Sequence, residues 1–424
     1  MINPKQLFGM NHTRKYWYYN INQEQQWNNY SFFPSVHDLH QLELVKQQEQ
    51  QLLFIAEPED TLFFRHQPEE EFMDYLSEEG VNIPKILPWG DVHRIAFKDT
   101  DPSLLIPYIV SEELSSYHSD KSSIKLFGSD INLIKRINNK FETRRLAESH
   151  GFQVTKGFFC NSSEALRCAY KNLRDQGFKN MVIKIPYGSS GKGLKVIDSE
   201  KSLEMIIGFI SRRNHSFELL LEGWHPVRNN LNCQLWIDRE KVLVLAITEQ
   251  KIDANGMYLG TNFTPRHDSG IIQQYSDEIL RLGSILRDLG YNGLCGVDSI
   301  IGEDDILYPI IEINARFTQV TYILPMVDYL SHDYSYVISS FINLGSEHRY
   351  RFNEVYTMLK QRLRPDTSNH FLIYTFASYT IPDDNKTIYR IFILFYGNNQ
   401  EKIQCMMDCL HKLHGTQIHP DEVQ

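Results

Sequence analysis

The sequence predicts a multidomain protein whose domains belong to the α/β and α+β classes. Its 424 residues are too many for one hydrophobic core, which favours two or three domains. Strand and helix patterns first alternate, strands then become more frequent, and the last segment combines two strands with two helices. We therefore expect an open α/β domain over 1–130, a larger strand-rich domain over 131–345 and a small α+β domain over 346–424.

The N-terminal elements are predicted from apolar runs and helix-boundary signals. The run LLFIAEP at 52–58 follows a glutamine-rich stretch of good helix formers and is expected to be a buried strand. The segment 68–80 predicts a helix, because a proline suits its first turn, acids crowd its start and a glycine ends it. PKILPWG at 84–90 and SLLIPYIV at 103–110 are two further strand candidates, and the alternation indicates an α/β domain.

The central and C-terminal elements are predicted from the same signals. Apolar residues recur at helical spacing through 129–151, and further helices are expected at 162–177 and 277–290, each ending at a glycine. The strand candidates of the central region are the runs at 182–185, 194–197, 218–223, 231–238, 241–247, 294–301 and 306–314. The C-terminal region is expected to contain helices at 351–363 and 400–415 and strands at 369–380 and 388–397.

Composition narrows the classes of function. A net charge of −10 argues against a nucleic-acid-binding surface. The six cysteines follow no metal-binding or disulfide spacing, which fits buried thiols in a reducing compartment. The N-terminus lacks the apolar segment of a signal peptide, and the longest apolar runs are too short to span a membrane. We expect a cytoplasmic protein, for which a homodimer is compatible with the sequence.

A glycine-rich loop between two short apolar runs suggests a phosphate site. The loop GSSGKG contains Gly188, Ser189, Ser190, Gly191 and Gly193, and it opens onto a strand rather than the helix that a P-loop or a dinucleotide fingerprint requires. We interpret it as a β-hairpin whose glycine N–H groups can approach phosphates. An ordinary hairpin tip is the alternative that the loop alone leaves open.

The stretch 293–317 predicts a second hairpin with a metal site. When the turn is centred on Asp305, Asp298 and Glu312 face each other across the two strands, and Asn314 lies on the same face as Glu312. Two carboxylates and an amide oxygen suit Mg²⁺ or Mn²⁺ shared with phosphates. Arg316 continues this face and could meet an oxyanion or a phosphoryl group. The alternative is a solvated face, which the apolar neighbours of both carboxylates make less favourable.

In this order the motifs resemble the ATP-grasp superfamily of ligases, over about 131–345. They are NNK before a helix, the lysine of VIKI, the glycine loop, LLLEGWHP, GVDSII and EINAR. The resemblance implies that Lys140 and Lys184 contact the phosphates of ATP and that the glycine loop is the lid over them. It also implies that Asp298, Glu312 and Asn314 bind Mg²⁺ and that Arg316 steadies the transferring group, with Arg316 and Lys184 as catalytic residues. The adenine-binding hinge that it implies consists of Glu222, Gly223, Trp224 and His225.

One feature departs from the family pattern, and the flanking regions indicate a subgroup. The acid that often follows the hinge and binds ribose has no clear match, and Asn229 falls near that place. PKILPWG, RINNK and RIFILFYGNNQEKI resemble biosynthetic amino-acid and peptide ligases that carry an N-terminal pre-ATP-grasp domain. Arg266, in the segment after VLVLAITEQ, is a candidate for pinning a substrate carboxylate, with a surface arginine as the alternative.

The resemblance predicts an ATP-dependent, ADP-forming ligase. A substrate carboxylate would attack ATP to give an acyl phosphate, which an amine would then convert to an amide. The alternative acceptor is the thiol of an acyl or peptidyl carrier protein, which the nucleotide-binding core does not distinguish from an amine. A non-catalytic ATP-binding module and a phosphotransferase are the rivals from other classes. The complete set of metal ligands with Arg316 favours an enzyme.

Overall fold

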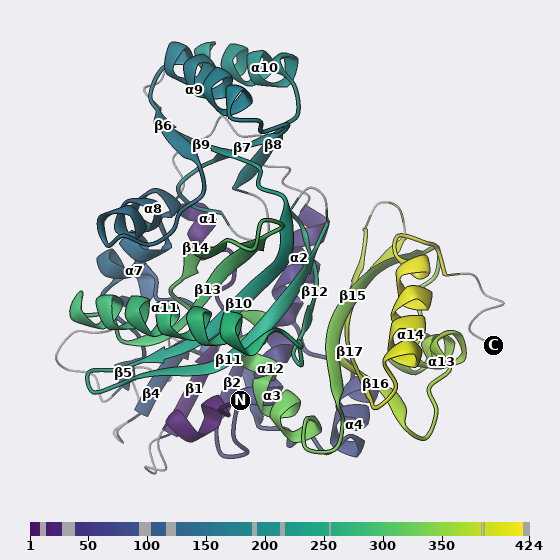
Figure 1. The fold of residues 1–424 in the computed structure, drawn as a ribbon. Helices are drawn as coiled ribbons and strands as arrows, with labels where there is room; N and C mark the ends of the chain where they lie inside the picture. Colours follow the sequence, from purple (N-terminus) through teal and green to yellow (C-terminus); the bar gives the residue numbers. More distant parts are fainter. Residues whose placement is uncertain are drawn as a thin grey trace.

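The computed structural model describes residues 1–8, 14–27, 39–92, 103–115, 124–188, 193–212, 217–253, 256–382, 384 and 386–418. These residues form three β-sheets with helices packed against them, and Figure 1 shows the smallest sheet above the other two. The mixed α/β and α+β class predicted from the sequence is confirmed. No helix in the described part of the chain combines the length and the apolar character needed to cross a membrane.

The N-terminal sheet is parallel throughout and has the strand order β3-β2-β1-β4-β5. Its strands are β1 (Arg14–Tyr18), β2 (Thr61–Phe64), β3 (Lys85–Pro88), β4 (Ser103–Pro107) and β5 (Ile124–Leu126). Its short helices are α1 (Gln23–Gln26), α2 (Leu39–Lys46), α3 (Leu52–Ile55), α4 (Glu70–Glu78) and α6 (Glu112–Ser115). The open α/β architecture expected from the alternation is present.

Two N-terminal elements differ from the sequence-based expectation. The run LLFI at 52–55 is the fully buried helix α3, and the neighbouring strand is β2 instead. An apolar run of four residues suits a buried helix turn as well as a buried strand, so hydrophobicity alone does not distinguish the two structures. The central strand β1 was not predicted, because a parallel strand covered on both faces lacks the alternation of an amphipathic strand.

The second sheet has the order β6-β9-β7-β8 and forms a small unit with its own core. Its strands are β6 (Gly157–Cys160), β7 (Met181–Lys184), β8 (Leu194–Ile197) and β9 (Leu219–Gly223). Helices α9 (Ser163–Asp175) and α10 (Glu200–Ser211) lie over one side of it (Figure 1). Helices α7 (Ile131–Asn138) and α8 (Lys140–Ser149) precede it in the chain, with α8 packed on β14 of the large sheet.

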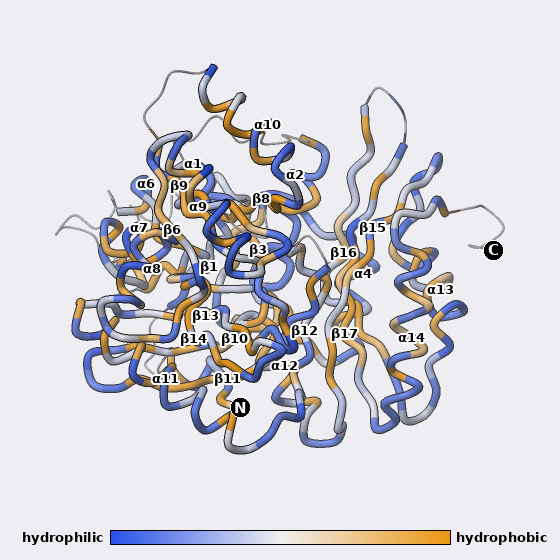
Figure 2. The backbone as a smooth tube through the Cα atoms, turned by 45° about the horizontal axis from the view of Figure 1, so that its top comes forward, coloured by the Kyte–Doolittle hydropathy of each residue, from blue (hydrophilic) through white to orange (hydrophobic). Residues whose placement is uncertain are grey.

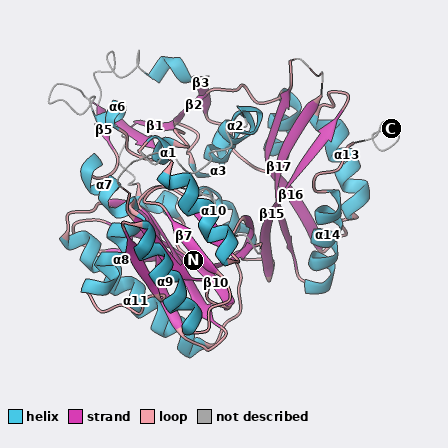
Figure 3. Cartoon of the chain, turned by 90° about the horizontal axis from the view of Figure 1, so that it is seen from above, coloured by secondary structure: helices cyan, strands magenta, loops and turns pink. Residues whose placement is uncertain are grey.

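The third sheet has eight strands in the order β14-β13-β10-β11-β12-β15-β17-β16. They are β10 (Val227–Ile237), β11 (Val242–Ile252), β12 (Tyr258–Asn262), β13 (Gly293–Gly302), β14 (Leu307–Asn314), β15 (Tyr336–Ser346), β16 (Asn369–Thr380) and β17 (Thr387–Gly397). The helices that follow or separate these strands are α11 (Ser269–Asp288), α12 (Gln319–Leu330), α13 (Phe352–Leu363) and α14 (Gln400–Leu413). Viewed from above, β15, β16 and β17 with α13 and α14 form one side of the molecule (Figure 3).

One continuous core joins the N-terminal sheet to the large sheet. The hydrophobic residues concentrate on the strands, whereas α14 alternates hydrophobic and hydrophilic positions as a surface helix does (Figure 2). Strand β15 ends at Ser346 and pairs with both β12 and β17, so the sheet runs through the boundary placed at 345. The division into three domains stays a prediction.

Buried glutamines cover the free edge of the large sheet. Strand β16 is the last strand of that sheet, and the 3₁₀ helix η2 (Gln47–Gln51) packs beside it. Gln50 accepts a hydrogen bond from the Phe376 amide at 2.7 Å and donates one to the Phe376 carbonyl at 3.0 Å. Because these amides pair as a neighbouring strand would, the edge is not left open to another chain. The glutamine-rich stretch is therefore part of the interior.

Candidate active site

The predicted hairpin of β13 and β14 is confirmed, with the expected register at its carboxylates. Asp298 pairs with Glu312 and Gly296 with Asn314. The register shifts between Asp298 and Ile300, so a bulge follows the carboxylate pair on the turn side. Both carboxylates and the amide therefore start from adjacent positions on neighbouring strands.

Asp298 is held by three amide groups. Its Oδ1 accepts hydrogen bonds from Asn232 Nδ2 and Gln250 Nε2, each at 2.8 Å, and its Oδ2 accepts one from Asn314 Nδ2 at 3.1 Å. Burial, followed by the nearby charge of Glu312, raises the pKa of Asp298 to about 6. A carboxylate on a freely solvated face would not be enclosed in this way, so the arrangement favours a site that receives a cation.

Lys140 connects the metal candidates to the glycine loop. Asn139 caps α8 by accepting from the amides of Phe141 and Glu142, which places Lys140 at the first helical position. The Lys140 Nζ donates to Glu312 Oε1 at 2.9 Å and to the Gly188 carbonyl at 2.6 Å, and its side chain is only 4% exposed. This ammonium group therefore lies between one predicted metal ligand and the base of the predicted lid.

The glycine loop begins and ends as an antiparallel hairpin. Strands β7 and β8 pair in register, and the Ile185 amide donates to the Gly193 carbonyl at 3.1 Å. A Cβ added to Gly193 would lie 3.3 Å from the Gly188 Cα, so a side chain would crowd this close approach. Ser189, Ser190 and Gly191, which are predicted to contact phosphate, lie outside the described residues.

Lys184 is paired with a buried carboxylate. Its Nζ lies 2.5 Å from Glu222 Oε2, and Arg144 Nη1 donates to Glu222 Oε1 at 2.7 Å. Burial alone would raise the pKa of Glu222, but Lys184 and Arg144 hold it below its ordinary value. Phosphate was the counter-charge expected for Lys184 from the sequence, and the contact of Arg144 with Glu222 was not predicted. The KFETRR segment offered no signal that this arginine reaches the hinge strand.

The predicted hinge is tied into the small sheet through its backbone. The Gly223 amide donates to the Lys156 carbonyl and the Trp224 amide to the Asn180 carbonyl, each at 2.9 Å. His225 Nε2 accepts from the Lys156 amide at 3.2 Å, and burial lowers the pKa of His225, which favours the neutral imidazole. The adenine contacts assigned to this segment stay a prediction. The backbone amides of Gly223 and Trp224 already donate to protein carbonyl groups.

Arg316 is buried and is held by a residue that the sequence analysis missed. Its Nε and Nη2 donate to the two carboxylate oxygens of Glu24 at 2.8 and 3.2 Å, and Nη2 also donates to Asn314 Oδ1 at 2.7 Å. Burial would lower the pKa of Arg316, but Glu24 and Tyr108 hold it above its usual range. Glu24 belongs to α1 of the N-terminal region, and 292 positions separate it from Arg316. Only tertiary contact brings the two together.

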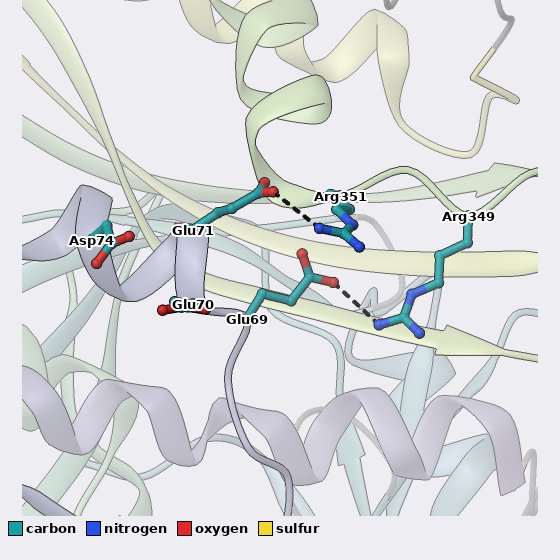
Figure 4. A pocket seen from close by; sticks show the side chains of 6 residues that line it. All are labelled: Glu69, Glu70, Glu71, Asp74, Arg349 and Arg351. Carbon is teal, nitrogen blue, oxygen red and sulfur yellow. Dashed lines mark hydrogen bonds and ion pairs between the residues drawn. The ribbon is translucent and has the colours of Figure 1, made fainter.

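Neither the ring contact of Arg266 nor the lining of the cavity in Figure 4 includes a residue of this cluster. Arg266 is exposed and rests over the Tyr336 ring at 5.2 Å, which fits the surface alternative. A cavity of about 510 Å³ lies between α4 and the segment before α13, and none of the predicted site residues lines it (Figure 4). Its lining residues are Glu69, Glu70, Glu71, Asp74, Arg349 and Arg351.

The chain shows extended similarity to proteins of known family. Residues 137–320 match the model of the ATP-grasp domain. A relative from Niallia circulans, the butirosin acyl-carrier protein L-glutamate ligase, is 40% identical over 419 residues, 98% of this chain and 99% of the relative.

Solved structures share the fold at low identity. N5-carboxyaminoimidazole synthetase from Staphylococcus aureus has a TM-score of 0.56 at 12% identity over 94% of this chain and 97% of its own. Biotin carboxylase from Campylobacter jejuni, in a β,γ-ATP complex, has a TM-score of 0.56 at 13% identity over 87% and 89%.

These findings define the class of protein. The chain belongs to the ATP-grasp family, and it is an ATP-dependent ligase. The resemblance stated from the sequence motifs is thereby confirmed, and the non-catalytic module is not supported.

Proposed function

We propose that this ligase activates the carboxylate of an amino acid, L-glutamate in the first instance, and transfers the acyl group to a carrier-protein thiol. The support for the thiol acceptor is the relative of 40% identity across nearly the whole chain, a carrier-protein glutamate ligase. The support for the chemistry is the arrangement of Asp298, Glu312, Asn314 and Arg316 at the end of one hairpin. The amide-forming reaction, given first from the sequence, becomes the alternative acceptor chemistry.

The carboxylate hairpin fits a hard divalent cation. Among the described residues no three His, Cys, Asp or Glu side chains meet as a metal cluster, so the candidate donors are Asp298, Glu312 and the amide of Asn314. Burial, followed by the charge of Glu312, raises the pKa of Asp298, so a cation shared with this carboxylate would favour its charged form. We assign these three residues to Mg²⁺ or Mn²⁺, which when bound would neutralise the phosphate oxygens of ATP.

Both lysines would contact the phosphates of ATP. Lys140 contacts both Glu312 and the carbonyl of Gly188, so a small rotation of its side chain would direct it to a phosphate under the loop. Lys184 starts from the same sheet as the loop and points to Glu222. Together with the loop they would hold the transferring phosphoryl group in line with the substrate carboxylate.

The proposed reaction has two steps. A carboxylate oxygen of the amino acid attacks the γ-phosphorus of ATP, and the bond from this phosphorus to the β-phosphate oxygen breaks. The products are an acyl phosphate and ADP. The carrier thiolate then attacks the acyl carbon, the C–O bond to phosphate breaks, and a thioester and free phosphate result. Arg316, fixed by Glu24, would hold the oxyanion of the tetrahedral species.

Product analysis tests the proposal. The enzyme with Mg-ATP and L-glutamate is expected to form a hydroxamate and ADP when hydroxylamine replaces the acceptor, and a carrier-bound thioester when the carrier is present. Formation of AMP would contradict the acyl phosphate, and an amide product in the presence of free amines would favour the alternative acceptor. Glu312→Gln should abolish both signals while leaving the far-ultraviolet spectrum unchanged, which assigns them to this site.

A further inference from the structure

Two hydrogen-bonded amide side chains on β10 lead to the predicted metal ligand Asp298. Asn232 is directly opposite Asp298 in the pairing of β10 with β13, and Gln234 is opposite Gly296. Asn232 and Gln234 are two residues apart on one strand, so their side chains leave the same face of the sheet. Gln234 Nε2 donates to Asn232 Oδ1 at 2.6 Å, and Asn232 Nδ2 donates to Asp298 Oδ1 at 2.8 Å. The two amides therefore connect the carboxylate to whatever holds Gln234.

Gln234 is held by the N-terminal cap of α12. Thr318 and Thr321 form a capping box, in which each hydroxyl oxygen accepts from the backbone amide of the other residue. Because each oxygen already accepts a backbone N–H, each O–H is free to donate, and both donate to Gln234 Oε1, at 2.9 and 2.7 Å. These donors hold the oxygen of the Gln234 amide toward the helix and its NH₂ group toward Asn232. The cap thereby sets which end of the Asn232 amide faces the carboxylate.

Gly296 provides the space for these contacts. A Cβ added there would lie 2.8 Å from Thr318 Cγ2 and 3.2 Å from Gln234 Nε2, so a side chain at this position would displace both groups. Gln234 and Asn232 are only 1% and 2% exposed. An amide that turned over in this interior could not replace its lost hydrogen bonds with bonds to bulk water. The orientation of both amides is therefore strongly favoured.

The other oxygen of Asp298 is held by a chain of the same polarity. Arg316 carries only N–H donors, and its Nη2 donates to Asn314 Oδ1 at 2.7 Å. This turns Asn314 Nδ2 toward Asp298 Oδ2, to which it donates at 3.1 Å. Gln250 Nε2 adds a second N–H at Oδ1. A carboxylate has about four lone-pair positions, so these donors leave one of them, on Oδ2, for a cation.

We propose that Gln234 is a positioning residue, which orients the carboxylate of Asp298 for a divalent cation through Asn232. This rests on the proposed function, which assigns Asp298 to Mg²⁺ or Mn²⁺. In the observed orientation Asn232 offers an N–H to Oδ1, and the carboxylate keeps Oδ2 for the cation. Turned over, the Asn232 amide would bring its oxygen against the carboxylate, and two acceptors without a proton between them repel each other. The carboxylate would then rotate away from the position that suits the cation.

Mn²⁺ binding to the full-length enzyme tests this role. Free Mn²⁺ is measured by electron paramagnetic resonance in titrations without nucleotide, so that the result does not depend on turnover. Gln234→Met keeps the length of the side chain but removes its hydrogen bonds, and it should weaken Mn²⁺ binding by about 10- to 100-fold. Gln50→Met is the matched control, because Gln50 is 2% exposed and also uses both ends of its amide. This control should bind Mn²⁺ as the wild type does.

A double-mutant cycle separates positioning from a general structural effect. Because Gln234 is proposed to act through Asn232, Gln234→Met should cost little further affinity in an Asn232→Leu background. Thr321→Val removes one of the two hydroxyl donors and should weaken Mn²⁺ binding by about fivefold, whereas Thr321→Ser, which keeps the hydroxyl, should match the wild type. This pair of variants tests the role even where Gln234→Met does not fold.

Three outcomes would overturn the role of Gln234. They are losses of affinity that multiply in the double variant, an equal loss in Gln50→Met, and equal binding by Thr321→Val and Thr321→Ser. Mn²⁺ binding that is lost in Asp298→Ala but unchanged in Gln234→Met would refute this role alone and leave the proposed function standing. Equal binding by the wild type and Asp298→Ala would refute the metal assignment itself, and the role of Gln234 with it.

Discussion

Replacing Glu24 tests whether a residue outside the sequence motifs sets the position of Arg316. The two side chains are 9% and 6% exposed, and the carboxylate accepts from both Nε and Nη2 of the guanidinium. In Glu24→Gln the amide keeps one acceptor, but its NH₂ group faces an N–H donor of Arg316. One charge-assisted bond is lost, and the arginine remains buried without its counter-charge.

The magnitude follows from that geometry. A hydrogen bond to a charged group contributes about 1.5–3 kcal/mol, and an uncompensated buried charge adds to the loss, so misplacement of Arg316 should cost about 2–4 kcal/mol. At 1.36 kcal/mol per factor of ten this is roughly a 30- to 1,000-fold fall in kcat for hydroxamate formation. Because Glu24 is paired with Arg316 and not with Lys140 or Lys184, which are assigned to the phosphates, the KM for ATP should change little. Glu24→Asp, which keeps the charge on a shorter stem, should recover part of the rate.

The assay measures ADP release and hydroxamate as functions of each substrate. Glu59→Gln, which changes an exposed acid of the same region, is the control and should behave as wild type. Unchanged kcat in Glu24→Gln, alongside an inactive Arg316→Met, would show that Arg316 does not need this carboxylate. A fall in the Tm with an unaltered rate per folded molecule would reduce Glu24 to a structural role.

Three further predictions concern stability. Glu222→Gln should lower the free energy of unfolding by about 3 kcal/mol in urea titrations, because it leaves two buried cations without their shared carboxylate; Glu204→Gln, in an exposed pair, should leave the midpoint unchanged. Glu69→Ala should lower it by about 1 kcal/mol, because that carboxylate accepts from the first amide of α13 at 2.9 Å, and an unchanged urea midpoint would contradict this. Hydrogen bonding to Glu49, opposed in part by burial, raises the pKa of His66, so its stabilisation is complete at low pH and is lost as pH rises through the folded-state pKa. The Tm difference between wild type and His66→Gln should therefore be larger near about pH 6 than near about pH 8.5, and an equal difference would refute the assignment.

The parts of the site that the sequence predicted are those fixed by local rules. A two-residue period and a short turn were enough to place Asp298 opposite Glu312, because register in a hairpin follows from its turn. Lys140 was expected from the resemblance of NNK to the family motif, and it lies at the first position of α8, which Asn139 caps. Each of these relations spans fewer than about twenty residues.

The parts that the sequence did not predict depend on contacts between distant segments. Glu24 meets Arg316 across 292 positions, and Arg144 meets Glu222 across 78. Glu24 and Arg144 do not stand out in the sequence, since each lies in a segment with several polar or charged residues. The run LLFI forms a helix packed against α12, and this contact with a distant segment cannot be predicted from its hydrophobicity alone.

Three buried cations predicted to contact ATP or the transferring group explain why both the predicted and the unpredicted residues matter. Lys140 pairs with Glu312, Lys184 with Glu222 and Arg316 with Glu24, so each of these three cations already has a carboxylate partner. Two of these carboxylates, Glu222 and Glu24, are nearly inaccessible and can only position their partners. Glu312 is 23% exposed and can receive a cation in place of Lys140. Under the proposed function, a cation at Glu312 would release Lys140 toward the phosphates, while Glu222 and Glu24 keep Lys184 and Arg316 in place.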